Sequence, residues 1–191
     1  MLKIGLTGGI GVGKTTVAKI FESFGIPVFY SDTESKALMF DPQIKTHVIE
    51  LFGEESYDSN QLNKKHIADQ LFGDSKKRNS LEAILHPRVR EEFQKWASKQ
   101  KTPYVINESA LIFEKNLASY FDKIILVKAP LDLRINRVME RDHSTETEVK
   151  ARIALQEQTS KNENLSDFII NNDNLANLEL ICKDIHYKLT K

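Results

Sequence analysis

Residues 8–15 bring glycines, one lysine and one hydroxyl side chain together in a single short segment, GGIGVGKT. The segment fits the pattern G-x-x-x-x-G-K-[ST], in which glycines let successive backbone N–H groups turn inward and form a concave anion site. Lys14 would then reach the β- and γ-phosphates of a nucleoside triphosphate, and the Thr15 hydroxyl would ligate Mg²⁺. Thr16 could donate to the α-phosphate. The predicted nucleotide-binding residues are Gly8, Gly11, Val12, Gly13, Lys14, Thr15 and Thr16.

The residues on both sides of this segment predict the strand and the helix that such a loop needs. Leu2–Thr7 is a short, mostly apolar run that ends at glycines, as a buried parallel strand does. From Lys14 onward the apolar residues follow a helical period, and Gly25 suits the end of that helix. The N-terminus of the helix would add its partial positive charge to the site. These flanks argue against a chance lysine in a glycine-rich turn.

Other classes of nucleotide-binding protein are disfavoured by residues that the sequence lacks. The dinucleotide-binding motif G-x-G-x-x-G does not match. If the motif began at Gly9, its last glycine would fall on Lys14, and if it began at Gly11, on Thr16. The guanine-reading N-K-x-D motif of a GTPase switch is also missing, since the nearest match, residues 63–66, reads NKKH. A motor ATPase would need a longer chain. A small-molecule kinase that uses ATP remains.

Composition bears on the cellular compartment and the binding partners of the protein. The chain has 191 residues, and its 27 basic and 27 acidic residues cancel, so no overall field attracts nucleic acid or an anionic membrane. Cys182 is the only cysteine, which rules out an intrachain disulfide and fits a reducing compartment. The sequence shows no secretory signal and no apolar run of about 18 residues. We expect a cytoplasmic protein with no nucleic-acid or membrane partner. A monomer is expected, with an oligomer as the alternative.

Strands that alternate with helices predict an α/β fold with a parallel sheet of about five strands. The expected strands are Leu2–Thr7, Pro27–Tyr30, Tyr104–Asn107, Lys123–Val127 and Phe168–Ile170. The helical stretch between the second and third strands is too long for one crossover, so we expect an inserted helical subdomain that binds the substrate. The expected division is a core of residues 1–31, 102–130 and 166–191, a subdomain of about 32–101 and a helical lid of about 131–160.

Helix boundaries are expected at glycine and proline within these segments. The charged, helix-rich stretch from Asn63 to Lys101 should break at Gly73 and at Pro87. In the lid, helices at Leu131–Arg141 and Glu146–Ser160 should flank a polar tip.

Asp32 follows the second strand, at the carboxyl edge where open α/β sheets bind ligands. We expect the first two strands to be neighbours, about 4.8 Å apart, so that a carboxylate there could reach a hydroxyl aligned with the γ-phosphate. An aspartate in this place also suits a plain helix N-cap. Position alone favours neither role over the other.

Arg134, Arg137 and Arg141 are spaced i, i+3 and i+7, and hence share one stripe of a helix. Spacing alone favours a solvated basic face, paired with Glu140 or Asp142. The polar tip that follows also suits a lid, because arginines that close over the transferred phosphoryl oxygens recur in such kinases. Both interpretations remain open from the residues themselves.

Beyond these local patterns, the chain resembles the dephospho-CoA kinase family over most of its length. Residues 5–16 are similar to the family's first motif, G-L-T-G-G-I-G-x-G-K-[ST]-T. The later landmarks that match in order are Gly25–Val28 with Asp32, Phe52-Gly53, Leu62-Asn63, Leu81-Glu82, His86-Pro87, Leu111–Glu114, Arg137, Arg141-Asp142, Arg152, Gln156 and Asp167–Asn172. The phosphate loop is generic, and the later landmarks together point to this family. Ser31 departs from it, because the family usually carries the first aspartate of a D-x-D there.

The resemblance implies a P-loop kinase that uses ATP and Mg²⁺ to phosphorylate the ribose 3′-hydroxyl of dephospho-CoA, the last step of coenzyme A synthesis. It implies catalytic roles for Asp32, Lys14, Arg137 and Arg141, and nothing firm for Arg134. The alternative is a related nucleotide or small-metabolite kinase, such as one acting on nucleoside monophosphates. A third possibility is a regulator that binds a nucleotide without catalysing a reaction.

Three further polar residues follow predicted strands. Glu108 stands where a Walker-B carboxylate would end the third strand, and it could hold a magnesium-bound water. Asn171 and Asn172 follow the last strand, where kinases of this class line the adenine pocket with backbone. Their side chains would then serve only the turn.

Overall fold

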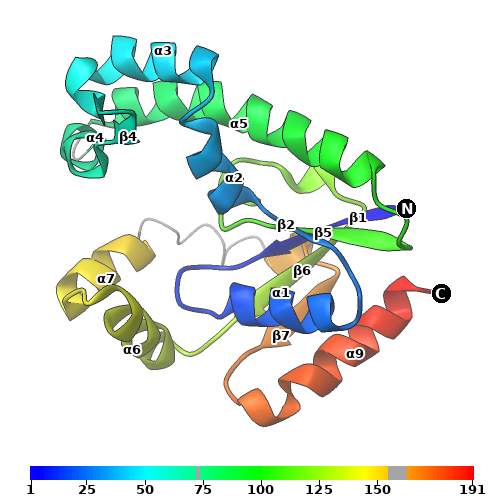
Figure 1. Cartoon of the computed structure of the whole chain (residues 1–191). Coiled ribbons are helices and arrows are strands. Elements are labelled where there is room, and N and C mark those ends of the chain that lie inside the picture. Colours follow the sequence, from blue (N-terminus) through cyan, green and yellow to red (C-terminus); the bar gives the residue numbers. More distant parts are fainter. Residues whose placement is uncertain (72–73, 155–162) are drawn as a thin grey trace. The chain divides into compact units, whose positions relative to one another are not determined.

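The computed structural model describes residues 1–71, 74–154 and 163–191, and its central feature is a five-stranded parallel sheet (Figure 1). The strands are β1 (Leu2–Thr7), β2 (Val28–Tyr30), β5 (Tyr104–Glu108), β6 (Lys123–Lys128) and β7 (Phe168–Asn171). Their order in the sheet is β2-β5-β1-β6-β7, and every neighbouring pair is parallel. The expectation of a five-stranded parallel sheet is confirmed. One premise is wrong: β1 and β2 are not neighbours, because β5 lies between them.

The register of the strands brings their carboxyl ends to one edge. Leu6 is level with Glu108 on one side and Ile125 on the other, while Glu108 is level with Tyr30. At the far side, Asn171 is level with Lys128. Side chains that follow the strands along the chain therefore gather where open α/β sheets bind ligands.

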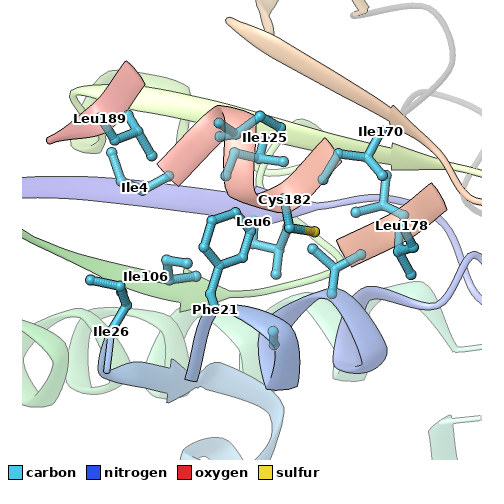
Figure 2. Packing of buried hydrophobic residues seen from close by; sticks show 14 of the residues in the cluster. Ile4, Leu6, Phe21, Ile26, Ile106, Ile125, Ile170, Leu178, Cys182 and Leu189 are labelled. Carbon is cyan, nitrogen blue, oxygen red and sulfur yellow. The ribbon is translucent and has the colours of Figure 1, made fainter. Parts of the chain in front are cut away.

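Two helices pack against the sheet and close its main core (Figure 2). α1 (Lys14–Ser23) contributes Phe21, and α9 (Leu178–Leu189) contributes Cys182. The strands supply mostly β-branched residues and leucine, as strands buried on both faces do. Their buried members include Ile4, Leu6, Ile106, Ile125 and Ile170. Burial of each such side chain contributes about 1.5–3 kcal/mol, so this core holds the loop between β1 and α1 on a rigid base.

The remaining elements of this part of the chain follow β5 and β6. Between β5 and β6 a short 3-10 helix spans Ala118–Tyr120. After β6 come α6 (Leu131–Asp142) and α7 (Glu146–Ala154), which pack against each other through Ile135, Val138 and Val149. Two further 3-10 turns span Glu163–Leu165 and Leu175–Asn177. Both α6 and α7 lie where helices were predicted, and residues 155–160 of the second predicted helix lie outside the described residues.

By its internal contacts, the chain divides into residues 1–30 with 99–191, and residues 31–98. The second unit contains α2 (Ser31–Leu38), α3 (Pro42–Phe52), α4 (Lys64–Leu71) and α5 (Ser75–Ser98). It also has a 3-10 turn at Glu54–Ser56 and a small hairpin of β3 (Tyr57–Asp58) and β4 (Gln61–Leu62), which the sequence did not indicate. Its separate apolar core consists of Met39, Ile44, Val48, Phe52, Ile67, Leu81 and Leu85.

The expected helix break at Pro87 is wrong, because α5 runs from Ser75 to Ser98 without interruption. A proline inside a helix removes one hydrogen bond and clashes with the preceding turn, at a cost of about 3 kcal/mol. Buried apolar residues at four-residue spacing continue on both sides of it, with Leu85 before and Val89 after. Pro87 itself is exposed, so the buried stripe of the helix passes it uninterrupted. The other expected break, Gly73, lies outside the described residues.

Over the described part of the chain, no helix has both the length and the apolar content to span a membrane.

Candidate active site

The loop between β1 and α1 borders a cavity of about 440 Å³ at the carboxyl edge of the sheet. Its walls come from the loop, the start of α1, the helix α6 and the residue after β7. The lining residues are Gly11, Gly13, Lys14, Thr15, Thr16, Arg137, Val138, Arg141 and Asn172. Most of the predicted phosphate-binding residues are therefore brought together with the two predicted lid arginines.

The loop backbone depends on glycine at two close approaches. Gly11 and Gly13 have φ angles of +79° and +91°, a region that side chains other than glycine rarely adopt. A Cβ at Gly11 would stand 2.6 Å from the carbonyl oxygen of Arg134, and one at Gly13 would stand 2.2 Å from Asn172 Nδ2. Gly13 also precedes the first residue of α1 and offers no side chain to cap it, so the first N–H groups of the helix face the cavity.

The side chain of Lys14 can contact a ligand of the loop, whereas that of Val12 is buried. The Lys14 ammonium donates to the carbonyl oxygens of Gly8 at 2.9 Å and Gly9 at 3.3 Å. Phosphate oxygens entering the loop would offer it stronger, charged acceptors. Val12 is 3% exposed and packs in the main core, so only its backbone can serve a ligand.

The three arginines of the predicted stripe have different surroundings. Arg134 is half-buried, donates from Nε to Ile10 O, and has its pKa lowered by burial. Arg137 donates to the carbonyl oxygens of Gly11 and Asn172 at 3.5 and 3.3 Å, and so lies directly over the loop. Arg141 is 63% exposed in its side chain. A uniformly solvated basic face is therefore excluded.

Arg141 is held by its neighbour in the sequence. Its Nε and Nη2 donate to the carboxylate of Asp142 at 2.7 and 3.1 Å, and Arg152 of α7 donates to the same carboxylate at 3.1 Å. The hydrogen bonds from Arg141 lower the pKa of Asp142 and those to Asp142 raise the pKa of Arg141. Since Arg141 also lines the cavity, its guanidinium can exchange this carboxylate for a phosphoryl group.

Glu108 ends β5 as a buried residue, 6% exposed, between the ends of β1 and β2. Its charge acts on Tyr30, whose pKa is raised to about 12 by burial, by a hydrogen bond to Glu22 and by the charges of Glu22 and Glu108. A carboxylate at this edge has the chemistry to bind a magnesium-bound water.

Asp32 follows Tyr30, the last residue of β2, with only Ser31 between them. The N-cap prediction for it is wrong: α2 begins at Ser31, so Asp32 lies inside the first turn. There its negative charge still favours the helix through the macrodipole. Of the two roles considered for Asp32, the catalytic one therefore stays a prediction.

Metal binding at this site would depend on few protein groups. Over the described residues, no cluster of three or more His, Cys, Asp and Glu side chains is arranged to hold an ion. Mg²⁺ typically takes one or two protein oxygens and completes its shell with phosphates and water. Thr15, on the cavity wall in the first turn of α1, fits such a site.

The comparisons with known proteins decide the family. The family model of dephospho-CoA kinase matches residues 2–177. The chain belongs to the dephospho-CoA kinase family.

Individual relatives agree with this assignment. A dephospho-CoA kinase of Bacteroides fragilis strain YCH46 is 38% identical over 174 residues, covering 90% of this chain and 85% of the relative. The crystal structure of TT1252 from Thermus thermophilus has a TM-score of 0.88 at 31% identity and covers 100% of this chain and 98% of that one. A dephospho-CoA kinase from Campylobacter jejuni has a TM-score of 0.71 at 22% identity, with 98% and 96% coverage, and supports the shared fold. The predicted P-loop kinase fold and family are confirmed.

One residue that lines the cavity was given too small a role by the sequence reasoning. Asn172 was expected near the adenine pocket with a side chain that serves only the turn, but it is 1% exposed, lines the cavity, and donates from Nδ2 to Val12 O at 2.8 Å. Its place directly after the last strand, at the ligand edge, was the available signal. Beside it, a second hollow of about 250 Å³ is lined by Lys128, Ala129, Pro130, Asn171 and Asp173.

Proposed function

We propose that this member of the dephospho-CoA kinase family transfers the γ-phosphoryl group of ATP to the ribose 3′-hydroxyl of dephospho-CoA, giving ADP and coenzyme A. The observation that carries the proposal is the match of residues 2–177 to the family, on a chain whose phosphate loop and lid arginines share one cavity. The related-kinase alternative has no comparable support, because relatives that cover most of the chain are dephospho-CoA kinases.

The residues around the cavity suit the binding of a triphosphate. The N–H groups of Gly11 and Gly13, with those at the start of α1, would hold the β- and γ-phosphates, with Lys14 between them and Thr16 at the α-phosphate. The hollow beside Asn171 would take the adenine. The Thr15 hydroxyl would hold Mg²⁺, which neutralises charge on the β- and γ-oxygens when bound.

In the transfer, a bond forms between the ribose 3′-oxygen and the γ-phosphorus, and the bond from that phosphorus to the β–γ bridging oxygen breaks. Asp32 would accept the proton of the attacking hydroxyl. Arg137 and Arg141 would donate to the equatorial oxygens, where charge spreads in the transition state.

The proposal includes ATP as the phosphoryl donor and Mg²⁺ as the metal ion. It also includes a cytoplasmic location and action as a monomer without nucleic acid. Residues 31–98 would contact the acceptor.

ADP release against a panel of acceptors tests this function. With Mg-ATP, we expect acceptor-dependent turnover with dephospho-CoA and only background release with AMP, dTMP and shikimate. Faster turnover with a nucleoside monophosphate would favour the related-kinase alternative. Tight ATP binding with no acceptor-dependent release would instead support a non-catalytic regulator.

A further inference from the structure

Two carbonyl groups of the phosphate loop accept short hydrogen bonds from side chains outside it. Arg134 Nε donates to Ile10 O over 2.9 Å, and Asn172 Nδ2 donates to Val12 O over 2.8 Å. The donors belong to different elements, since Arg134 is on α6 and Asn172 follows β7. The outer side of the loop is therefore held from two directions.

The carbonyl between these two has a weaker partner. Arg137 Nη1 lies 3.5 Å from Gly11 O, which is longer than the usual 2.7–3.2 Å of such a hydrogen bond. Its other nitrogen, Nη2, donates to Asn172 O at 3.3 Å. Arg137 can leave both acceptors for a phosphoryl group at little cost. The task of holding the loop then falls to Arg134 and Asn172.

These bonds on the outer side determine the direction of N–H groups on the inner side. In a planar trans peptide, the C=O and the N–H of the next residue point in opposite directions. Holding Ile10 O and Val12 O therefore fixes the N–H groups of Gly11 and Gly13. Both glycines line the cavity. Glycine backbone is otherwise free to adopt many conformations, and ordering it on ligand binding would weaken affinity.

Asn172 is itself held in place. Its backbone N–H donates to Lys128 O over 2.7 Å, which ties it to the end of β6. Because Val12 O can only accept, the amide nitrogen of Asn172 must face it. Within the described residues, nothing donates to its buried Oδ1. An unpaired buried oxygen costs about 1–3 kcal/mol, and the hydrogen bond from Nδ2 to Val12 O offsets this cost.

Arg134 is held by the packing of α6 on the loop. The Ile10 side chain packs on the cluster of Ile135, Val138 and Val149. Gly11 approaches the backbone of Arg134 so closely that a Cβ would not fit. A half-buried guanidinium therefore meets the Ile10 carbonyl without having to be ordered by the nucleotide.

We propose that Arg134 and Asn172 are positioning residues, which hold the phosphate loop in its anion-binding conformation before ATP arrives. Neither needs to touch the reacting atoms. The inference rests on the proposed function only in taking ATP as the ligand of the loop. It is tested by binding without an acceptor, so a wrong acceptor would not affect its outcome.

The variants are Arg134→Met, which keeps an apolar stem without the donor, and Asn172→Ala. Each should raise the Kd of Mg-ATP about three- to ten-fold, the range expected for one hydrogen bond. Calorimetry without acceptor measures this. The KM for dephospho-CoA should stay the same, and kcat should change less than two-fold at saturating ATP. Amide hydrogen exchange of residues 9–13 should be faster in the free variants and equal to wild type once ATP is bound.

Asn136→Ala, an exposed position on the same helix α6, is the matched control and should bind ATP like the wild type. Unchanged ATP affinity and unchanged exchange in both Arg134→Met and Asn172→Ala would overturn the proposal. An equal rise in Kd for ATP and KM for dephospho-CoA, with a lowered Tm, would also overturn it, because that pattern signals general loss of structure.

Discussion

Replacing Asp32 by asparagine is expected to lower kcat about 10²–10⁴-fold with little change in stability or ATP affinity. General-base catalysis typically contributes a factor of this size, and the substitution removes only the base and its charge. Because Ser31 alone separates Asp32 from Tyr30, its Cα stays within about 7 Å of the end of β2. In the sheet β5 lies between β1 and β2, so the ends of these two strands are about 10 Å apart, two strand spacings.

Glu34→Gln is the matched control for this prediction. Both Asp32 and Glu34 lie in the first turn of α2, so each substitution loses about the same favourable interaction with the helix dipole. Any fall in Tm should therefore be small and equal in the two proteins, while kcat falls only in Asp32→Asn. An Asp32→Asn enzyme that turns over dephospho-CoA within a few-fold of wild type would remove Asp32 from the mechanism. A raised Mg²⁺ requirement would add a role as ligand to a magnesium-bound water.

Removing either lid arginine is expected to lower kcat by a factor on the order of 10²–10⁴, somewhat below the range known for arginine fingers. Charge spreads over the transferred group only in the transition state, so ATP affinity should change less than kcat. Arg137→Ala and Arg141→Ala are measured in steady state with both substrates varied. Lysine at either position should restore only part of the rate, because it lacks the bidentate fork.

Lys150→Ala serves as the control on the lid. Lys150 is exposed on α7 and pairs with Glu146, a surface interaction that contributes little. Its kcat should equal that of the wild type. Near-normal kcat in both alanine variants, Arg137→Ala and Arg141→Ala, would show that these side chains serve the surface of the lid and not the reaction.

What the sequence could predict depended on local signals. The phosphate loop, the five strands and the lid helices all follow from spacing and periodicity within short windows. Strand order does not, because β5 inserts between β1 and β2 through contacts distant in the chain. Periodicity locates strands but carries no information about which of them become neighbours.

The side-chain contacts that were missed are those that the fold makes between distant residues. Asn172 and Val12 are 160 positions apart, and only the meeting of β7 with the loop shows their hydrogen bond. The spacing of the arginines predicted that they share one helix face, but their surroundings could not be predicted. The carboxylate of Asp142 binds Arg141, while a carbonyl group of the phosphate loop binds Arg134. At Pro87, the continuous buried stripe of α5 outweighed a local helix-breaking signal.

Identification of the product formed from ATP and dephospho-CoA tests the central claim most directly. The purified protein is incubated with Mg-ATP carrying a labelled γ-phosphoryl group, with Lys14→Ala in parallel, and the product is analysed by mass spectrometry and ³¹P NMR. The account predicts one labelled phosphate on the ribose 3′-oxygen, giving coenzyme A and ADP, and loss of this product in Lys14→Ala. The account would be contradicted if folded wild-type protein left dephospho-CoA unmodified, or if the label were found at another position of the product.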